Sequence, residues 1–173
     1  SKAIKFASWN INSVKMRGQQ AIDWMKAVDC DVLFMQEIKC MDENFPVALF
    51  NDAGFEVHVH GQKSYNGVAI ASRIPLMDVR RGLPLLTDSP DSPDDMEDEQ
   101  ARYIECDVAG DNGAGVTIGG LYMPNGNPTI DDDGNMHPKL VYKLDWMKRL
   151  NAHADRMNKD GRQMVFCGDF NII

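Results

Sequence analysis

The sequence predicts an α/β fold, classed as α+β in some schemes, in which helices cover a sandwich of β-sheets. Two observations support this prediction: short apolar runs recur along the chain, and two amphipathic helical segments lie between them. The chain has 173 residues, 43% of them hydrophobic, which is enough for one sizeable core and too little for two comfortable domains. We therefore expect a single domain over residues 1–173.

Four of the predicted strands share one design, a continuous apolar run followed at once by polar residues. Continuous apolar runs are typical of strands that are buried on both faces. Because the scaffold fixes each strand, the polar residues beyond its end are free to carry chemistry. The four runs are Ile4–Trp9 before Asn10, Val32–Met35 before Gln36 and Glu37, Val116–Leu121 before Tyr122, and Met164–Cys167 before Gly168 and Asp169.

Helices and further strands fill the intervals between these runs. Apolar residues at helical spacing predict helices over Arg17–Asp29 and Pro138–Met157, and segments 55–60, 67–72 and 101–108 are predicted strands. The strand over 55–60 alternates apolar and polar residues, as a half-buried strand does. The predicted core faces of the two helices consist of Ala21, Ile22, Met25 and Val28, and of Leu140, Leu144, Met147, Leu150 and Ala154.

Several side chains are expected to be buried. The four cysteines form no CxxC pair, so we predict reduced, mostly buried thiols in a cytoplasmic protein. Trp24 and Trp146 are predicted to pack in the core. No apolar run reaches the roughly 20 residues that a membrane span needs, so no membrane partner is expected. His58 and His60 lie two residues apart without an obvious third ligand, which favours exposed strand residues over a zinc site.

The charge distribution neither predicts nor excludes a nucleic-acid partner. The formal net charge is −8, but seven acidic residues and no basic ones lie within Thr87–Gln100, so the rest of the chain is close to neutral. That acidic, proline-containing segment is most simply a solvated surface loop.

The polar residues at the four strand ends suit a hard metal cation. They comprise carboxylates, amides and a tyrosine, without the histidine–cysteine cluster that zinc favours, so Mg²⁺ is the expected cation. Glu37 can anchor it, Asp169 can orient or deprotonate a water, and Asn171 and Tyr122 can hold phosphate oxygens. Each of these residues alone is also typical of a turn or a solvated loop, so the prediction rests on their occurrence in one chain.

Six stretches together resemble the exonuclease III family of apurinic/apyrimidinic endonucleases, within the endonuclease/exonuclease/phosphatase superfamily. The Gln-Glu and Gly-Asp-x-Asn elements mark the superfamily, while Gly-Gln-Lys and Tyr-x-Pro-Asn-Gly point to its DNA-repair branch. The stretches occur in the family's order and span nearly the whole chain: Trp9–Val14, Gln36–Lys39, Gly61–Val68, Ala101–Ile104, Gly120–Gly126 and Gly168–Asn171.

The resemblance implies a four-layer αββα sandwich and a magnesium-dependent DNA-repair nuclease, in which Mn²⁺ can replace Mg²⁺. The implied activities are 3′–5′ exonuclease and abasic-site endonuclease in base excision repair, on double-stranded DNA with abasic sites or 3′ ends. The implied metal ligands are Glu37, Asn10, Asp169 and Asn171; the implied catalytic residues are Tyr122 at the scissile phosphate, Asp169 at the attacking water and Asn171 at the pentacoordinate phosphate; and Asn12, Asn125, Arg102 and Lys39 fall near the DNA.

One departure from the family leaves three hypotheses open. The family continues past its Gly-Asp-x-Asn motif to a second carboxylate and a Ser-Asp-His motif, whereas this sequence ends at Ile173 and is interpreted as truncated there. The parent protein would then be a monomeric nuclease. The chain as given would be a catalytically incomplete fragment that dimerises through an exposed sheet edge. The third hypothesis is a superfamily phosphodiesterase or phosphatase that acts on lipid or inositol phosphates.

Overall fold

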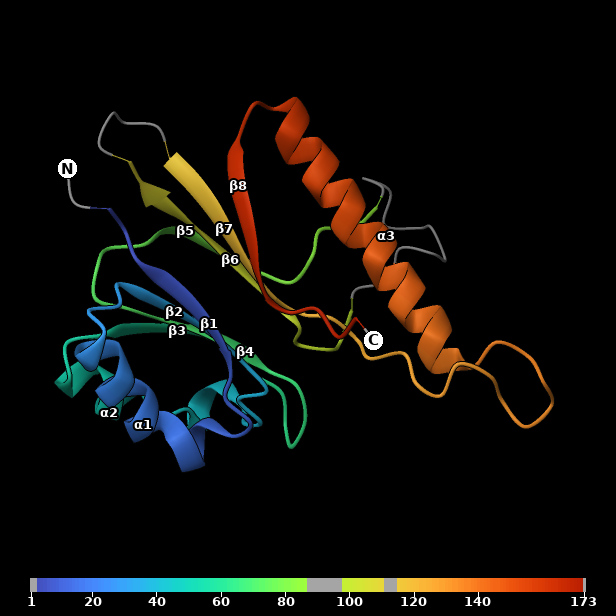
Figure 1. The fold of residues 1–173 in the computed structure, drawn as a ribbon, viewed down its shortest axis with the longest axis horizontal. Coiled ribbons are helices and arrows are strands. Elements are labelled where there is room, and N and C mark those ends of the chain that lie inside the picture. The colour runs from blue at the N-terminus through green and yellow to red at the C-terminus, as the bar shows by residue number, and fades with distance from the viewer. Residues whose placement is uncertain (1–2, 87–97, 111–114, 173) are drawn as a thin grey trace.

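Two four-stranded sheets lie face to face, with helices on both outer sides, in a computed structural model that describes residues 3–86, 98–110 and 115–172 (Figure 1). Helices α1 (Val14–Ala27) and α2 (Val47–Asp52) cover the first sheet, and α3 (Pro138–Lys159) covers the second. A short 3₁₀ turn, η1 (Asp42–Asn44), precedes α2. The layers therefore run α, β, β, α, and the predicted α/β sandwich is confirmed.

The two sheets are built on a similar plan. The first has the order β1-β2-β4-β3 and the second the order β5-β6-β7-β8. In each sheet one pair is parallel, β1 with β2 and β7 with β8, while the other pairs are antiparallel. The strands are β1 (Phe6–Asn10), β2 (Val32–Gln36), β3 (Glu56–His60), β4 (Val68–Ser72), β5 (Met77–Arg81), β6 (Tyr103–Ala109), β7 (Gly115–Tyr122) and β8 (Gln163–Asp169).

Side chains of the central strands fill the core on both sides of each sheet. In β2, Leu33 and Met35 pack beneath α1 and α2, while Val32 and Phe34 pack between the sheets. The ring of Phe34 occupies the space that a side chain at Gly120 would fill, so glycine allows the two sheets to approach closely there. This two-sided burial explains why the strands that carry the site are continuous apolar runs.

Several local predictions are wrong for identifiable reasons. Trp24 is 41% exposed because it lies off the buried stripe of α1, whereas Trp146 is 2% exposed, as predicted. Leu144 is 40% exposed because the buried stripe of α3 consists of Trp146, Leu150, His153 and Met157. Helix α1 begins three residues earlier than predicted, at Val14, and the short elements α2 and β5 were not predicted at all.

The histidines of β3 are also less exposed than predicted. Val57 and Val59 face the helices, so His58 and His60 on the opposite face lie half-buried toward the second sheet. Burial lowers the pKa of His60 below its ordinary value. Within the described part of the chain, no group of three or more His, Cys, Asp or Glu side chains is arranged to hold a metal.

The cysteine prediction is confirmed in its structural part. All four thiols are free, with Cys30, Cys40 and Cys106 buried and Cys167 half-buried. Burial raises the pKa of Cys106 and of Cys167 to about 12, so both remain protonated at neutral pH. Among the helices that the structure describes, none has both the length and the apolar character that crossing a membrane requires.

Candidate active site

The carboxyl ends of four strands meet at one end of the sandwich. The edge strand β1 of the first sheet lies against the edge strand β8 of the second, and their parallel partners β2 and β7 end at the same level (Figure 1). Asn10 ends β1, Tyr122 ends β7, Asp169 ends β8, and Glu37 directly follows β2. The structure thus brings together the four strand-end residues that the sequence analysis singled out.

One amide connects the two carboxylates of this site. The Nδ2 of Asn10 donates a hydrogen bond of 3.0 Å to Oδ2 of Asp169 and another to Oε2 of Glu37. On its other side, Oδ1 of Asn10 accepts a bond of 3.2 Å from the backbone N–H of Asn12, which orients the amide. Two carboxylates from different sheets therefore converge on a single neutral donor.

Left-handed backbone conformations are concentrated around this point. Asn12, Ser13, Glu37, Lys39 and Asn171 all have φ between 42° and 84°. Such conformations cost non-glycine residues about 1–3 kcal/mol each and persist where the surroundings hold them. Here the backbone N–H of Ser13 donates to the carbonyl of Glu37 at 2.8 Å, which ties the loop after β1 to the loop after β2. The strained residues thus lie in the loops that follow β1, β2 and β8.

Tyr122 is the aromatic member of the site. Burial raises the pKa of its hydroxyl, and the nearby Glu37 charge, with a hydrogen bond between the two side chains, adds to this effect. The Arg102 guanidinium, 4.8 Å from the centre of the tyrosine ring, acts in the opposite direction. Because the net shift is upward, the Tyr122 hydroxyl stays protonated at neutral pH and donates its one proton to Glu37.

The loops after β7 and β8 are fastened to each other. The backbone N–H of Met123 donates to the carbonyl of Asp169 at 2.9 Å, and Nδ2 of Asn171 donates to the carbonyl of Met123 at 2.8 Å. Oδ1 of Asp169 accepts from the backbone N–H of Asn171 at 3.1 Å. Gly168 has φ +142°, and a side chain there would collide with the backbone of Leu121, so glycine is required before Asp169.

The remaining predicted residues lie around the rim. Nζ of Lys39 donates to Oδ1 of Asn12 at 2.6 Å and lies 3.6 Å from Glu37, on the side of the two carboxylates. Asn125 and Arg102 line a groove of about 590 Å³ beside Tyr122. Oδ1 of Asn125 already accepts a hydrogen bond from the backbone N–H of Asn127 at 2.7 Å. Its Nδ2 is therefore the atom of this side chain that can donate to a ligand.

Four neighbours of the site were not singled out as site residues. Tyr142 and Gln100 line the same groove as Arg102, and Nζ of Lys143 donates to the carbonyl of Asn171 at 2.8 Å. Tyr65, part of the Gly61–Val68 stretch but given no role, is 71% exposed at the groove. None of them follows a predicted strand end, so the pattern that identified the other site residues could not find them.

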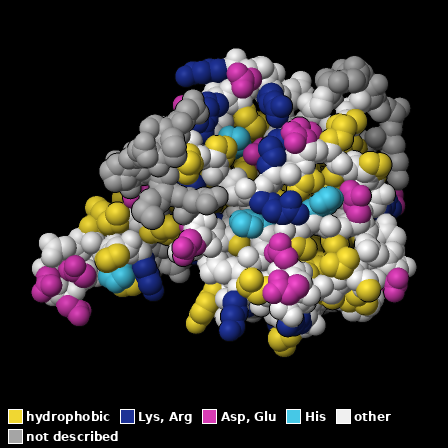
Figure 2. Space-filling model, turned by 180° about the vertical axis from the view of Figure 1, so that it is seen from behind, with side chains coloured by type: hydrophobic (Ala, Val, Ile, Leu, Met, Phe, Trp, Pro, Cys, Tyr) yellow, Lys and Arg dark blue, Asp and Glu magenta, His cyan; other side chains and the backbone are white. Residues whose placement is uncertain are grey.

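Charged side chains of both signs are interspersed over the face seen from behind, without one continuous basic field (Figure 2). On this face, therefore, the described residues form no broad positive surface to attract a polyanion.

Comparison with known proteins places this geometry in a family. The family described as Endonuclease/Exonuclease/phosphatase matches residues 7–173. The chain belongs to this family. It is 30% identical over 169 residues to exodeoxyribonuclease III of Haemophilus influenzae, covering 98% of this chain and 58% of that relative. The chain thus spans somewhat more than half the length of this curated relative.

Two solved structures of family proteins are close in both sequence and fold. A 3′ phosphatase from Neisseria, NExo, bound to a product DNA hairpin, superposes with a TM-score of 0.78 at 34% identity. An AP endonuclease from Archaeoglobus fulgidus gives a TM-score of 0.76 at 32% identity. In both comparisons the alignment covers 98% of this chain and 58% of the other. The family resemblance inferred from the six sequence stretches is confirmed.

Proposed function

We propose that the chain carries the metal- and phosphate-binding part of a magnesium-dependent DNA-repair nuclease, which hydrolyses phosphodiesters at abasic sites and at 3′ ends. The observation that carries the proposal is the sharing of one Asn10 amide by Glu37 and Asp169, at the ends of strands from two sheets. The relatives named exodeoxyribonuclease III and AP endonuclease, and the DNA hairpin bound to NExo, support the substrate class.

The residues present fit a hard divalent cation. Glu37 and Asp169 would supply carboxylate oxygens, and Asn10 and Asn171 amide oxygens, to a cation such as Mg²⁺. Mn²⁺ accepts the same oxygen donors. The Asn10 amide is oriented by its hydrogen bonds, and a half-turn of this group would present Oδ1 instead of Nδ2 to a cation.

The chemistry divides among three side chains. When bound, the cation would polarise a phosphoryl oxygen and offset charge that develops on it. Asp169 would accept a proton from the attacking water, and its hydrogen bond to the backbone N–H of Asn171 keeps its carboxylate in place. The second N–H of the Asn171 amide would donate to one phosphoryl oxygen, and the Tyr122 hydroxyl would donate to another in place of Glu37.

Four rim residues would bind the DNA backbone. Arg102 beside Tyr122 and Asn125 across the groove would contact one side of the scissile phosphate. Lys39 and Asn12, which are bonded to each other at 2.6 Å, would contact the other side. Arginine and lysine are the usual phosphate partners, and contacts of this kind position a nucleic acid without reading its sequence.

The test is cleavage of a duplex that contains one abasic site, with Mg²⁺ and with EDTA. We expect nicking that requires the metal, and release of phosphate from a 3′-phosphate end. An inositol phosphate serves as the competing substrate for the phosphatase hypothesis. Faster hydrolysis of the inositol phosphate than of either DNA would reject the DNA-repair assignment.

A second candidate function is a unit that binds metal and DNA without turnover. The positions of the four histidines favour this candidate. All four lie in the described part of the chain, and no hydrogen bond there joins any of them to a residue of the site. His153 bonds Glu105 at 2.8 Å, and His137 caps α3. Robust Mg²⁺-dependent nicking by the 173-residue chain would reject this candidate, whereas metal-dependent DNA binding without cleavage would support it.

A further inference from the structure

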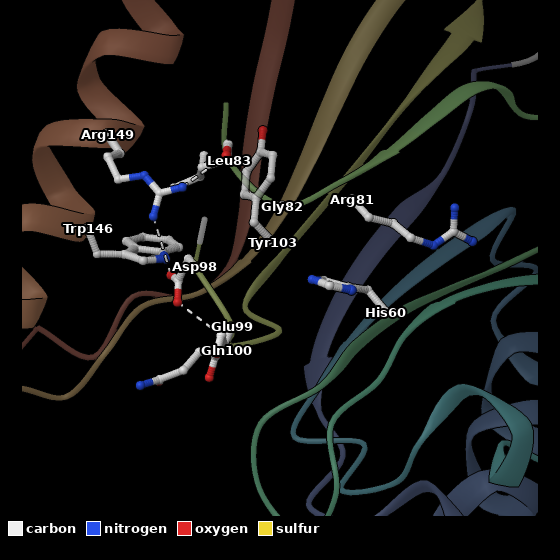
Figure 3. A pocket seen from close by; sticks show the side chains of 10 residues that line it. All are labelled: His60, Arg81, Gly82, Leu83, Asp98, Glu99, Gln100, Tyr103, Trp146 and Arg149. Carbon is white, nitrogen blue, oxygen red and sulfur yellow. Dashed lines mark hydrogen bonds and ion pairs between the residues drawn. The ribbon is translucent and has the colours of Figure 1, made fainter. Parts of the chain in front are cut away.

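The end of the acidic segment packs against α3, where Asp98 lines a second pocket that shares Gln100 with the groove of Arg102. Thr87–Gln100 was predicted to be a solvated loop; residues 87–97 lie outside the described part, but for Asp98 the prediction is wrong. The Asp98 side chain is 14% exposed, pairs with Arg149 at 3.5 Å, and accepts a hydrogen bond of 2.7 Å from the Tyr142 hydroxyl. Figure 3 shows Asp98 beside Trp146 and Arg149, both from α3.

Arg102 is contacted by two residues that are hydrogen-bonded to Asp98, and by Tyr122. Its guanidinium carbon lies 4.8 Å from the ring centre of Tyr122 and 5.8 Å from that of Tyr142, so two tyrosine rings flank it. Its Nε donates to Oε1 of Gln100 at 2.8 Å, and its Nη1 donates to the Tyr122 carbonyl at 3.2 Å. Cation–π contacts of this kind gain strength where the groups are shielded from water.

The bond between Asp98 and Tyr142 is suited to fixing the second ring. A hydrogen bond to an ionised acceptor is stronger than one between neutral groups. Burial raises the pKa of Tyr142, with the Asp98 hydrogen bond adding to it, so the hydroxyl remains a donor at neutral pH. A tyrosine that is anchored at its hydroxyl cannot swing its ring away from Arg102. Asp98 also accepts a hydrogen bond from the backbone N–H of Gln100 at 2.9 Å. It therefore holds two of the residues that contact Arg102, namely Tyr142 and Gln100.

We propose that Tyr142, anchored by Asp98, is a positioning residue that holds the Arg102 guanidinium against Tyr122, where it meets a phosphate of the nucleic acid. The identity of the phosphate rests on the proposed function, whereas the arrangement of the four side chains does not. A guanidinium that is already oriented loses less conformational freedom when it binds, so the benefit appears as affinity.

The first experiment follows Arg102 itself in the 173-residue chain and requires no turnover. The measurement is nitrogen-15 NMR of the arginine side chains, with the Arg102 signal assigned from its loss in Arg102→Lys. Contact with the two tyrosine rings should appear as a ring-current shift of this signal and as slow exchange of Nε–H. We expect Tyr142→Leu and Asp98→Ala to move this signal toward that of an exposed arginine. Asp98→Asn, which keeps an acceptor for the tyrosine hydroxyl, should leave it in place. An unchanged Arg102 signal in Tyr142→Leu would overturn the proposal.

The second experiment measures affinity for a fluorescent abasic duplex by anisotropy. Tyr142→Leu should weaken binding about fivefold, on the scale of one partly shielded cation–π contact, and Asp98→Asn less than twofold. Circular dichroism establishes that each variant is folded, and Asp98→Ala carries the test if Tyr142→Leu is not. If wild-type chain fails to bind DNA while Tyr142→Leu still releases Arg102, the positioning stands and the DNA assignment fails. Equal affinities for wild type and Tyr142→Leu would refute the role in binding.

Discussion

Two carboxylate pairs in this molecule are treated in opposite ways. Glu37 and Asp169, the site pair, converge on one neutral amide, and the Lys39 ammonium lies 3.6 Å from Glu37. Glu105 and Asp107, on the β6 face beneath α3, are surrounded by donors. The comparison separates carboxylates that stabilise the fold from carboxylates that leave negative charge for a ligand to neutralise.

The buried pair is neutralised from three elements. Arg80 on β5 reaches Glu105 at 3.1 Å and Asp107 at 3.0 Å, His153 on α3 reaches Glu105 at 2.8 Å, and Thr117 on β7 donates to Asp107 at 2.7 Å. Burial alone would raise the pKa of Glu105, but the hydrogen bonds from His153 and Arg80 lower it below its ordinary value. The pKa of Asp107 is lowered in the same way by Arg80 and Thr117, against its own burial.

The largest expected effect concerns the site pair, Glu37 and Asp169. Asp169→Asn should lower Mg²⁺-dependent nicking about 1000-fold, because a positioned general base contributes roughly 10²–10⁴-fold. The free energy of unfolding in urea should change by less than about 0.5 kcal/mol, since one of two neighbouring negative charges is removed. Asp132→Asn in the exposed loop before α3 is the matched control and should alter neither quantity. A large loss of stability in Asp169→Asn would mean that this carboxylate stabilises the fold instead.

The next effect, at Glu105 and Asp107, should be a loss of stability without a loss of nicking. Glu105→Gln should lower the free energy of unfolding by about 3 kcal/mol, because the Arg80 guanidinium loses the charge that compensates its burial. Nicking per folded molecule should be unchanged, since the cluster lies beneath α3 and not at the strand ends. Urea unfolding followed by tryptophan fluorescence measures the first quantity. If Glu105→Gln were as stable as wild type, the donors around this carboxylate would contribute nothing measurable.

The site pair could be predicted from the sequence, whereas the pair beneath α3 could not. Each site carboxylate follows a continuous apolar run, so a local pattern marks Glu37 and Asp169. Glu105 lies inside a strand, and its role depends on His153, which is 48 residues away and is brought near only when α3 packs on the sheet. The prediction for Asp98 was wrong for the same reason. The composition of Thr87–Gln100 indicated a solvated loop, whereas Asp98 accepts a hydrogen bond from Tyr142 and is largely buried. Local sequence predicts strand ends, but partners across the sandwich depend on packing.

A smaller effect tests whether the carboxylates of the site hold a divalent cation. Mg²⁺ at tenfold above its dissociation constant should stabilise the chain by about 1.4 kcal/mol, as expected for a ligand that binds only the folded state. Glu37→Gln should abolish this stabilisation, and Glu105→Gln should retain it. The measurement is thermal unfolding with Mg²⁺, with Mn²⁺ and with EDTA. Equal stabilisation of wild type and Glu37→Gln would locate the cation elsewhere.

The smallest effect is a pH dependence confined to the buried pair. The pKa of Glu105 is lowered in the folded state, so its contribution is fully present above the ordinary carboxyl pKa. It is then lost as the pH falls through the lowered value, because the folded state binds this proton less readily than the unfolded state does. The stability difference between wild type and Glu105→Gln should therefore be constant from pH 7 to about pH 5 and shrink at lower pH. Urea unfolding across this range checks the difference, and one that grows on acidification would mean that Glu105 is protonated more easily in the fold than in the unfolded chain.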